Sequence, residues 1–430
     1  MLFGTDGIRG KWGVGILHED SVKQIGKAIA AWSFSLSATP RILIITDTRE
    51  SCSIMKACLK VGLLSFPVTV FDAGVAPTPF AFHAFNYGEF DCAVVISASH
   101  NPYHDNGIKI LDKNNRKLSS HDESTISNLI QSPINTTETY GTDISTYNVA
   151  EMYYHHVSRY FNNNFLSGIN VVIDCANGAM SAFAPHIFEL LGATVITINN
   201  HPNGRNINAS AGALYPEVLQ HTVLQYNADI GFSFDGDGDR VIACSRDGVI
   251  KDGDDILALL ASYYKTTTVI GTVLTNYGLE EYLHQQNKVL LRSDVGDKNV
   301  LQMMRQSNAC IGGEPSGHII IEEFDYVGDG LMVALKIAQI MLETENYVLN
   351  TFEKYPQINI NVPATTKKNL AEHPFSELMQ EARQQINKGR IIVRFSGTEP
   401  VLRIMIEAID KQCAQLVGTV LAQKFKELLG

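Results

Sequence analysis

The sequence of 430 residues has no apolar run long enough to cross a bilayer and no pair of cysteines in C-x-x-C spacing. A membrane-spanning helix needs about 20 predominantly apolar residues, so no membrane segment is expected. The seven cysteines are scattered and odd in number, which indicates neither a zinc site nor a disulfide framework. We therefore expect reduced thiols and a cytoplasmic location.

The chain also has no excess of positively charged residues. Lys and Arg total 34 against 45 Asp and Glu, which gives a formal net charge of -11 at pH 7. This balance disfavours nucleic acid or an anionic membrane surface as a partner. Residues 1–6 contain neither the basic nor the apolar segment of a signal peptide, so we expect none.

Core-forming residues are plentiful, since 45% of the chain is hydrophobic. A chain of this length favours two to four domains over one core. Predicted strands and helices alternate in three successive rounds, which is typical of α/β domains with mostly parallel sheets. The last residues predict a smaller α+β domain with a largely antiparallel sheet. The expected domains are 1–147, 148–246, 247–355 and 356–430.

One predicted strand, 92–97, ends abruptly in small polar residues, at 97–102, and the segment 105–109 continues them. Ligands of open α/β folds bind at the carboxyl ends of strands. Ser99 offers a nucleophilic hydroxyl there, and His100 and Lys109 are close to it in sequence. A polar loop with a proline turn is the structural alternative.

Three aspartates separated by single glycines follow the predicted strand 229–234, namely Asp235, Asp237 and Asp239. Carboxylates this close repel one another without a cation, and Mg²⁺ prefers oxygen ligands. An EF-hand calcium loop is excluded, because Arg240 stands at its glycine position and Arg246 at its bidentate glutamate position. A solvated acidic turn is the remaining alternative.

The loop at 313–318 lies between two predicted strands. Its Glu314 and Ser316 have the donors and acceptors that neighbouring sugar hydroxyls require. A hairpin turn with incidental polar residues is the alternative.

The segment 394–400, with Arg403 after it, has the composition of a phosphate-binding loop. Hydroxyl groups and the backbone N–H groups around Gly397 can surround an anion, and arginine binds phosphate with two parallel hydrogen bonds. It lacks the P-loop pattern, and an ordinary turn between strands is the alternative.

Together these four loops offer a nucleophilic hydroxyl, a divalent cation, contacts to sugar hydroxyls and a separate phosphate site. Phosphoryl transfer on a sugar phosphate needs this combination, because positioning and charge neutralisation carry most of its catalysis.

The chain resembles the α-D-phosphohexomutases along nearly its whole length. The matching segments, in family order, are 3–10, 97–102, 105–109, 235–240, 313–318 and 396–400. Residues 206–208 and 295–297 resemble the members that act on glucosamine phosphates. The resemblance implies three similar mixed-sheet α/β domains and a smaller C-terminal α+β domain around a central cleft.

The resemblance also implies the reaction. Ser99 would carry a phosphate, give it to a bound hexosamine phosphate and take a phosphate back from the other end of the sugar. Glucosamine 6-phosphate and glucosamine 1-phosphate would be interconverted, feeding UDP-N-acetylglucosamine synthesis. A hexosamine 1,6-bisphosphate would be intermediate and activator. The same chemistry on mannose or glucose phosphates is the alternative, and a monomer or homodimer is expected.

Each matching residue has an implied role. One Mg²⁺ per active site would be held by Ser99, Asp235, Asp237 and Asp239. Proton transfer and charge stabilisation near Ser99 would involve Arg9 and Lys109. His100 and His318 would orient groups there. Sugar hydroxyls would contact Glu314 and Ser316. The non-reacting phosphate would be held by Arg394, Ser396, Gly397, Thr398 and Arg403.

Four positions depart from the family pattern, namely Cys52, Lys298, Pro315 and Phe395. Pro315 and Phe395 lie in the loops expected to bind the sugar and its phosphate. Lys298 replaces a frequent arginine, so a point charge stands in place of a planar fork. None of the four removes an expected catalytic group.

Two other function classes fit parts of the sequence. A phosphosugar-binding protein without turnover would not need Ser99, Lys109 and the three aspartates together. A serine hydrolase would place its nucleophile in a G-x-S-x-G elbow, which Ser99 lacks, and would leave the aspartate loop without a task.

Overall fold

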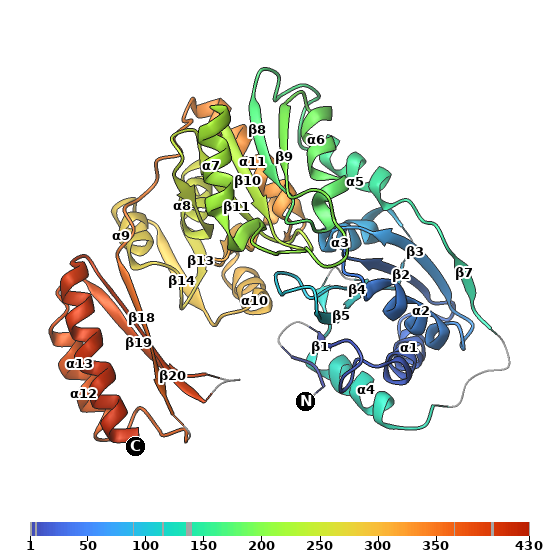
Figure 1. Cartoon of the computed structure of the whole chain (residues 1–430), viewed down its shortest axis with the longest axis horizontal. Coiled ribbons are helices and arrows are strands. Elements are labelled where there is room, and N and C mark those ends of the chain that lie inside the picture. Colours follow the sequence, from blue (N-terminus) through green and yellow to red (C-terminus); the bar gives the residue numbers. More distant parts are fainter. Residues whose placement is uncertain are drawn as a thin grey trace. The chain divides into compact units, whose positions relative to one another are not determined.

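The computed structural model describes residues 2–4, 7–88, 90–113, 116–134, 140–364, 366–396 and 400–429 (Figure 1). It forms two compact units, one of Met1–Val273 with Leu291–Asn350 and one of Leu274–Leu290 with Thr351–Gly430. The chain forms three mixed α/β sheets and a three-stranded antiparallel sheet. The expected fold class, three α/β domains and a smaller α+β domain, is confirmed. The expected boundaries after residues 147, 246 and 355 stay predictions.

The first sheet has the strand order β1-β5-β4-β2-β3-β7, with β6 paired to β5. Pairing is parallel among β2, β3, β4 and β7 and antiparallel at β1, β5 and β6. The strands are β1 (Ile8–Lys11), β2 (Arg41–Thr46), β3 (Thr69–Val75), β4 (Cys92–Ile96), β5 (Asp105–Asp112), β6 (Arg116–Lys117) and β7 (Thr142–Ile144). The helices are α1 (Glu19–Ser33), α2 (Cys52–Leu63), α3 (Thr78–Tyr87) and α4 (Ser120–Gln131).

Strand β2 shows why the sequence predicted a sheet covered on both faces. Ile42 and Ile44 belong to the core that α1, α2 and α4 build on one face. Leu43 and Ile45 are equally buried but lie outside that cluster. A continuous apolar strand of this kind is expected where helices cover both faces.

Strand β5 was not predicted as a strand, because its first residues, Asp-Asn-Gly, are typical of a turn. It pairs antiparallel with β4, and Lys109 is opposite Val95. The pairing buries β5 almost throughout. As a result, Lys109 projects from a rigid strand rather than from a loop.

The second sheet has the order β12-β11-β10-β8-β9. Its strands are β8 (Asn170–Asp174), β9 (Thr194–Ile198), β10 (Ile230–Phe234), β11 (Val241–Ser245) and β12 (Ile250–Lys251). Its helices are α5 (Val149–Ser158), η1 (Ala179–Ala182), α6 (Ala184–Leu190), η2 (Gly212–Leu214) and α7 (Pro216–Tyr226). The sequence pattern predicts a single helix over 179–191, but the structure divides this segment into η1 and α6. Pro185 lies in the first turn of α6, where its missing N–H is harmless, so a new helix begins there.

The third sheet has the order β14-β13-β15-β16-β17. Its strands are β13 (Thr268–Thr272), β14 (Val289–Ser293), β15 (Ile311–Gly313), β16 (Ile319–Ile321) and β17 (Val327–Gly328). The helices of this region are α8 (Gly253–Tyr263), α10 (Asp297–Ser307), η3 (Glu322–Phe324) and α11 (Gly330–Thr344). Helix α8 begins at a capping box, in which the Asp252 side chain accepts from Asp255 N at 3.4 Å and the Asp255 side chain accepts from Asp252 N at 3.1 Å. The sequence offers Asp252 or Asp254 as the cap of this helix, and the structure has Asp252 in that position.

The second unit contains the antiparallel sheet β18-β20-β19. Its elements are β18 (Gln357–Pro363), β19 (Gly389–Phe395), β20 (Val401–Ala408), α9 (Tyr277–Gln285), α12 (Phe375–Gln384) and α13 (Lys411–Leu429). Residues of α12 and α13 pack on one face of the sheet and form the core of this unit. The expected small α+β domain with an antiparallel sheet is confirmed.

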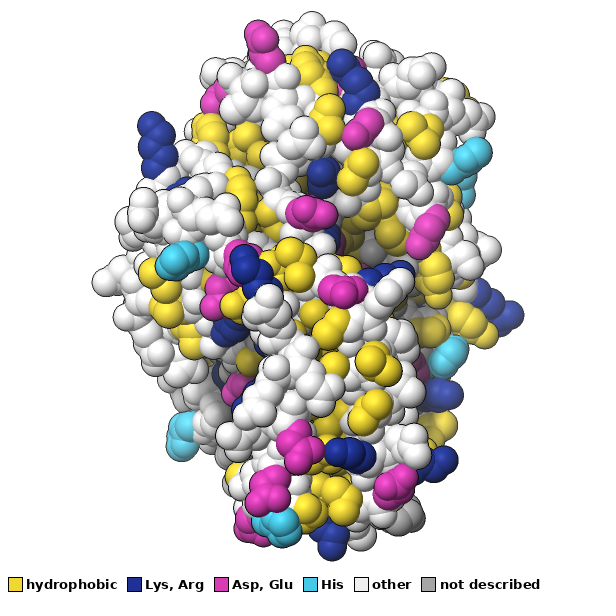
Figure 2. All heavy atoms as spheres, turned by 90° about the vertical axis from the view of Figure 1, so that its left-hand side faces the viewer, with side chains coloured by type: hydrophobic (Ala, Val, Ile, Leu, Met, Phe, Trp, Pro, Cys, Tyr) yellow, Lys and Arg dark blue, Asp and Glu magenta, His cyan; other side chains and the backbone are white. Residues whose placement is uncertain are grey.

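No helix among the described residues is long and apolar enough to cross a membrane. On the face shown in Figure 2, acidic and basic side chains are interspersed rather than gathered into a patch of one sign.

Helices α1 and α2 approach each other through two glycines. A Cβ atom at Gly26 would lie 2.3 Å from the Leu59 carbonyl oxygen, and one at Gly62 would lie 2.0 Å from the Lys23 carbonyl oxygen. Backbone atoms cannot move aside as flexible side chains do. The absence of a side chain at these two positions therefore sets the spacing of the helices.

We predict that Gly62→Ala destabilises the protein by about 1–3 kcal/mol, because the new methyl group overpacks the α1–α2 contact. This loss exceeds the roughly 1 kcal/mol that alanine gains in helix propensity. The midpoint of urea unfolding, followed by circular dichroism, measures the effect. Val61→Ala, at an exposed position on the same helix, is the control and should shift stability by no more than about 0.5 kcal/mol. Unchanged stability in Gly62→Ala would contradict the packing argument.

Candidate active site

The ends of β4 and β10, in different sheets, meet at Ser99. The Ser99 hydroxyl is buried and donates to Asp235 Oδ2 at 2.7 Å. His100 Nδ1 lies 3.3 Å from the same hydroxyl oxygen. The backbone of Ser99 is left-handed, with φ of 52°, a conformation that a non-glycine residue keeps only when its surroundings hold it. The expected nucleophile and the aspartate loop are thus brought together.

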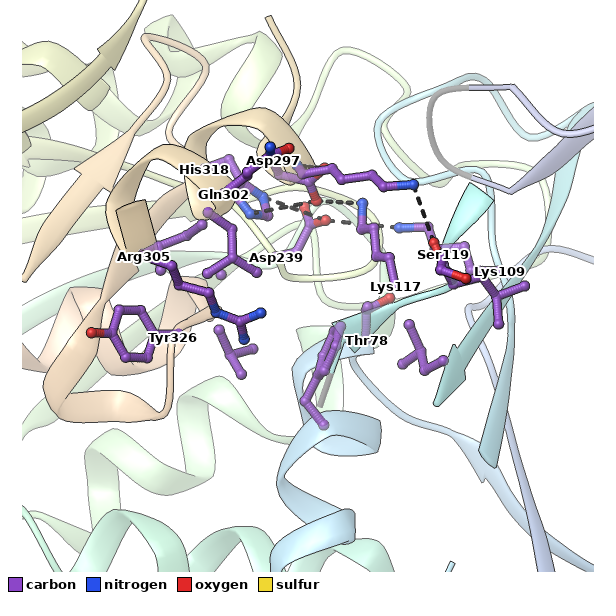
Figure 3. A pocket seen from close by; sticks show the side chains of 18 of the residues that line it. Thr78, Lys109, Lys117, Ser119, Asp239, Asp297, Gln302, Arg305, His318 and Tyr326 are labelled. Carbon is purple, nitrogen blue, oxygen red and sulfur yellow. Dashed lines mark hydrogen bonds and ion pairs between the residues drawn. The ribbon is translucent and has the colours of Figure 1, made fainter. Parts of the chain in front are cut away.

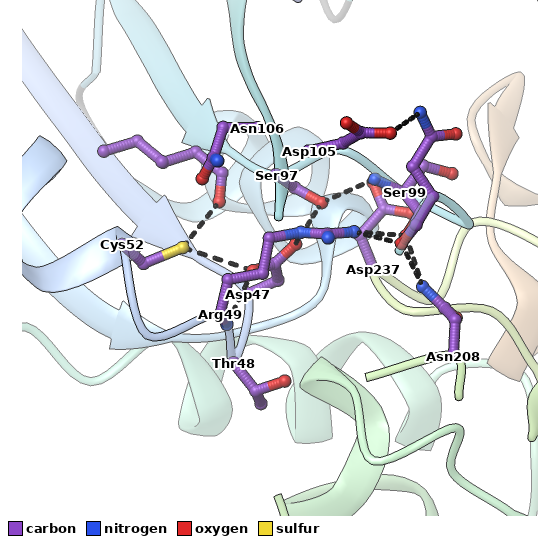
Figure 4. Close-up of polar contacts among 12 residues, drawn as sticks. Asp47, Thr48, Arg49, Cys52, Ser97, Ser99, Asp105, Asn106, Asn208 and Asp237 are labelled. Atoms are coloured by element: carbon purple, nitrogen blue, oxygen red, sulfur yellow. Dashed lines mark hydrogen bonds and ion pairs between the residues drawn. The ribbon is translucent and has the colours of Figure 1, made fainter. Parts of the chain in front are cut away.

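Hydrogen bonds to its backbone hold the Ser99 loop in place (Figure 4). The Ser99 carbonyl oxygen accepts from Arg49 Nη2 at 3.0 Å and from Asn208 Nδ2 at 2.9 Å. Both side chains also donate to the carbonyl oxygen of Asn101, at 2.9 Å and 3.1 Å. Two side chains from different domains therefore bind the same two carbonyl groups.

Asp47, at the end of β2, holds the side chains that support the Ser99 loop. It accepts from Arg49 Nε at 2.9 Å and from the Ser97 hydroxyl at 2.7 Å, and the Ser97 oxygen in turn accepts from Ser99 N at 2.9 Å. The Cys52 thiol donates to the other Asp47 oxygen at 3.2 Å. Ser97 therefore supports the loop, and Cys52 adds a contact to the same carboxylate.

The aspartate loop is contacted from β5, which supplies a positive charge, and from α3, which supplies hydrogen bonds. Lys109 Nζ lies 2.8 Å from Asp237 Oδ2 and 3.8 Å from Asp239 Oδ2. The Thr78 hydroxyl donates to Asp237 Oδ2 at 2.6 Å, and Thr78 N donates to the Asp237 carbonyl oxygen at 2.9 Å. Three carboxylates and one ammonium group thus share a buried volume.

Asp235 and Asp239 differ in their ionisation. Burial raises the pKa of Asp235 well above its ordinary value, and the charges of Asp239 and Asp237 raise it further. Burial also opposes the ionisation of Asp239, but Lys109 and a hydrogen bond from His318 outweigh it and hold the Asp239 pKa well below its ordinary value. Asp239 therefore ionises more readily than Asp235, so the negative charge lies more on the side of the loop that contacts Lys109 and His318 than on the side that contacts Ser99.

The donor set of this loop fits a hard divalent cation. Asp235, Asp237 and Asp239 each offer one carboxylate oxygen, and these atoms lie within 4.8 Å of one another. Among the described residues, Asp237 Oδ1 and Asp239 Oδ1 are buried without a hydrogen-bond partner. Oxygen ligands and uncompensated charge are what Mg²⁺ requires, and the Ser99 hydroxyl borders the same group.

His318 connects the aspartate loop to the third sheet. Its Nδ1 lies 3.6 Å from Asp239 and its Nε2 lies 3.8 Å from Asp297, which also pairs with Lys117. Burial alone would lower the pKa of His318, but the hydrogen bond with Asp239 raises it above the ordinary value. By contrast, burial and the charge of Arg240 lower the pKa of His100 to about 4, so its imidazole is neutral at pH 7.

A cavity of about 350 Å³ opens beside these groups (Figure 3). Lys109, Lys117, Asp239, Asp297 and His318 line one end of it, and Arg305 and Tyr326 lie towards the other end. Its size suits a small polar ligand, and its charged groups come from the first, second and third sheets.

The other expected site residues of the first unit are Arg9, Glu314 and Ser316. Arg9 is opposite Gly107 in the pairing of β1 with β5, the strand that carries Lys109. Glu314 accepts from Gly296 N at 2.9 Å and so fixes the loop before α10, while Ser316 lies in the following turn. Glu314 thus contacts the backbone of the segment 295–297, which in sequence resembles the members that act on glucosamine phosphates.

The expected phosphate-binding residues belong to the second unit. Arg394 and Arg403 are opposite each other in β19 and β20, and Ser396 is buried just beyond β19. Cross-strand pairing therefore brings the two guanidinium groups to neighbouring positions. Gly397 and Thr398 lie outside the described residues.

Sequence reasoning did not assign roles to several residues of this site. Arg49, Asn208 and Thr78 contact the Ser99 loop or the aspartate loop, and Arg240 lies 3.9 Å from Asp235. The available signal was positional, because Arg49 and Asn208 follow strand ends, where ligands of α/β sheets bind. Their partners, far away in the sequence, gave no local signal.

Family models match almost all of the chain. The models for "Phosphoglucomutase/phosphomannomutase, alpha/beta/alpha domain" I, II and III match residues 1–136, 151–248 and 252–357. The model for the "C-terminal domain" of the same family matches residues 360–421. The four matches follow one another in order along the chain.

Individual proteins agree with these matches. A phosphoglucosamine mutase of Coxiella burnetii is 39% identical over 435 residues, covering 98% of this chain and 97% of its own. A phosphoglucomutase/phosphomannomutase family protein of Burkholderia thailandensis superposes with a TM-score of 0.81 at 22% identity, over 99% and 97% of the two chains. An N-acetylphosphoglucosamine mutase of Aspergillus fumigatus, in complex with GlcNAc-6P and magnesium, has a TM-score of 0.71 at 16% identity, over 100% and 96%.

We predict that Asp237→Asn weakens Mg²⁺ binding at least about tenfold, because it removes one charge and one oxygen ligand. Asparagine can still accept the Thr78 hydrogen bond, so the loop should keep its shape. Isothermal titration calorimetry measures the affinity. The matched control is Asp247→Asn, an exposed aspartate in a turn of the same domain, which should bind Mg²⁺ as the unaltered protein does. Equal affinities in all three proteins would contradict the assignment of the loop.

Proposed function

Because the chain belongs to the phosphoglucomutase/phosphomannomutase family of α-D-phosphohexomutases, we propose that it is a phosphoglucosamine mutase. It interconverts glucosamine 6-phosphate and glucosamine 1-phosphate, an intramolecular phosphotransfer that supplies UDP-N-acetylglucosamine synthesis. The observation that carries the substrate assignment is the 39% identity to a phosphoglucosamine mutase over 98% of the chain. Mannose and glucose phosphates are the alternative substrates, and no comparison favours them over glucosamine.

Ser99 is the phosphate carrier in this proposal. The P–O bond to Ser99 Oγ breaks as the sugar hydroxyl oxygen bonds to phosphorus, and the hydroxyl proton passes to a neighbouring base. The second half-reaction returns a phosphate from the other end of the bisphosphorylated sugar to Ser99. The 2.7 Å hydrogen bond to Asp235 supports this role, because it aims the hydroxyl at the aspartate loop.

The residues around Ser99 divide the remaining tasks. Lys109 and Arg9 stabilise charge and take part in proton transfer, and Lys109 already touches Asp237 at 2.8 Å. His100 and His318 orient groups at the two sides of the aspartate loop. Asp235, Asp237, Asp239 and an oxygen on Ser99 hold one Mg²⁺, which supplies electrostatic stabilisation to the transferring phosphoryl group.

Substrate binding uses two further loops. Glu314 and Ser316 contact sugar hydroxyls, and their loop borders His318 in sequence. The non-reacting phosphate is bound by the second unit, through Arg394, Ser396, Gly397, Thr398 and Arg403. Binding energy from this remote phosphate aligns the reacting end of the sugar. A hexosamine 1,6-bisphosphate serves as intermediate and as activator that charges Ser99.

The cellular setting is also a proposal. All seven cysteines are free, which supports a reducing, cytoplasmic location. We expect a monomer or a homodimer with small-molecule substrates.

We predict that Ser99→Ala lowers turnover by more than about 10³-fold while the protein stays folded, since the nucleophile is lost but the loop keeps its backbone hydrogen bonds. A coupled assay for glucosamine 1-phosphate measures turnover, and intact mass measures the phosphate that a sugar bisphosphate adds to the protein. Ser53→Ala, on the surface of α2, is the control and should keep both signals. Full turnover of Ser99→Ala would refute the carrier role.

The substrate assignment has its own test. With Mg²⁺ and bisphosphate present, kcat/KM should be at least about tenfold higher for glucosamine 6-phosphate than for mannose 6-phosphate or glucose 6-phosphate. The reason is that a site built to pair the amino group leaves a polar group unpaired when a hydroxyl replaces it. A preference for mannose or glucose phosphate would establish the alternative function and leave the mechanism intact.

A further inference from the structure

His318 contacts the aspartate loop from the third sheet, and its ring lies between two carboxylates. The residue is 6% exposed and directly precedes β16. Its Nδ1 lies 3.6 Å from Asp239 Oδ2, and its Nε2 lies 3.8 Å from Asp297 Oδ2 (Figure 3). Each ring nitrogen therefore faces a carboxylate oxygen, one in the aspartate loop and one at the start of α10. Separations of this length leave the ring room to rotate, so packing must help to set its plane.

Asp297 is held from two directions. Its Oδ2 pairs with Lys117 on β6, and its Oδ1 accepts from Lys298 N at 2.7 Å. Strand β6 is paired with β5, so the first sheet fixes the cation that holds this carboxylate. Among the described residues, the Asp297 side chain has no hydrogen bond or ion pair with Ser99 or the aspartate loop. Its contact nearest to the reaction is therefore the one with His318.

Gly328, on β17, leaves room for the same ring. A Cβ atom at Gly328 would lie 2.1 Å from His318 Nε2 and 2.3 Å from its Cε1. Non-bonded atoms do not approach this closely, so an alanine would push the ring aside. The φ of Gly328 is not left-handed, so the backbone conformation does not require glycine here. The close approach of the imidazole accounts for it.

The backbone on both sides of this ring is fixed to the aspartate loop. Val241 N donates to the Gly317 carbonyl oxygen at 3.1 Å, and Gly330 N donates to the Gly238 carbonyl oxygen at 3.1 Å. The third sheet thus has two backbone hydrogen bonds with residues that flank the last aspartate. A displaced ring would therefore change its own side-chain contacts, while the sheet stays where it is.

We propose that Asp297 and Gly328 are positioning residues of the phosphotransfer reaction, which act by fixing the His318 imidazole against Asp239. The inference rests on the proposed function, in which Asp239 binds Mg²⁺ and His318 orients groups beside it. Asp297 directs one edge of the ring from α10, and Gly328 lets the ring approach β17. Groups of this kind matter because a small misplacement near the reacting atoms is costly in rate.

The first test is a double-mutant cycle on glucosamine 6-phosphate turnover. Asp297→Asn should lower kcat at least about tenfold and change KM by less than about threefold, since it acts on alignment rather than on binding. Asparagine can still accept from Lys298 N, so α10 should begin as before. In a His318→Gln background the same change should alter kcat by less than about twofold, because the ring on which it acts is gone. Equal losses in both backgrounds, or a loss confined to KM, would overturn the proposal.

Gly328→Ala should repeat this pattern, with a loss of kcat that disappears in the His318→Gln background. Two control variants should keep the kcat of the unaltered protein. Glu123→Gln breaks the 3.4 Å ion pair with Lys298, which joins the same two regions without touching His318. Asp294→Asn removes an exposed charge from the loop before α10. A loss of kcat in Glu123→Gln equal to that in Gly328→Ala would show that joining the regions, not placing the ring, matters.

A second readout does not need turnover. Nitrogen-15 NMR of the imidazole rings identifies the His318 signals as those absent from His318→Gln. Asp297→Asn and Gly328→Ala should each move these signals, and Glu123→Gln should leave them in place. Unmoved His318 signals in Asp297→Asn would overturn the proposal. Absence of any hexose phosphate turnover in the unaltered protein would instead refute the proposed function, and the NMR comparison would still decide whether Asp297 positions the ring.

Discussion

The hydrogen bond from the Ser99 hydroxyl to Asp235 is the contact on which the site depends. It joins the ends of β4 and β10, and it places a hydroxyl against a loop of three buried carboxylates. Such a loop is unfavourable without compensation, so Lys109, Arg240 and His318 surround it with positive or proton-donating groups. The negative charge of the loop is therefore balanced by nearby groups, an arrangement that suits a bound cation and a phosphoryl group.

The surrounding structure fixes the positions of the Ser99 loop and the aspartate loop. Arg49 and Asn208 bind the carbonyl oxygens of Ser99 and Asn101 from two different domains, so neither domain alone positions the nucleophile. Thr78, at the start of α3, binds both the side chain and the backbone of Asp237. The Ser99 loop is thus fixed by contacts that span the first and second sheets, which suits the proposed phosphoryl transfer, a reaction governed by positioning.

Much of this was predictable from the sequence, and the failures have physical reasons. Fully buried strands such as β2 and β4 are continuous apolar runs, so the alternation and the fold class could be predicted. Strand β5 was missed because Asp-Asn-Gly favours a turn, and only its pairing with β4 overrides that preference. Ser99 and the aspartates were found as motifs. Arg49 and Asn208 were given no role, although 206–208 was noticed as a matching segment, because their role lies in contacts with residues distant in the chain.

The antiparallel pairing of β4 and β5 makes the length of the chain between Ser99 and Lys109 part of the geometry of the proposed site. Lys109 is opposite Val95, and successive residues of a strand face opposite sides of the sheet. One residue more or fewer in the connecting turn, if the strands absorbed it by a shift in register, would direct Lys109 away from Asp237 without altering any residue of the site. The pairing therefore constrains the length of that turn more strictly than its composition.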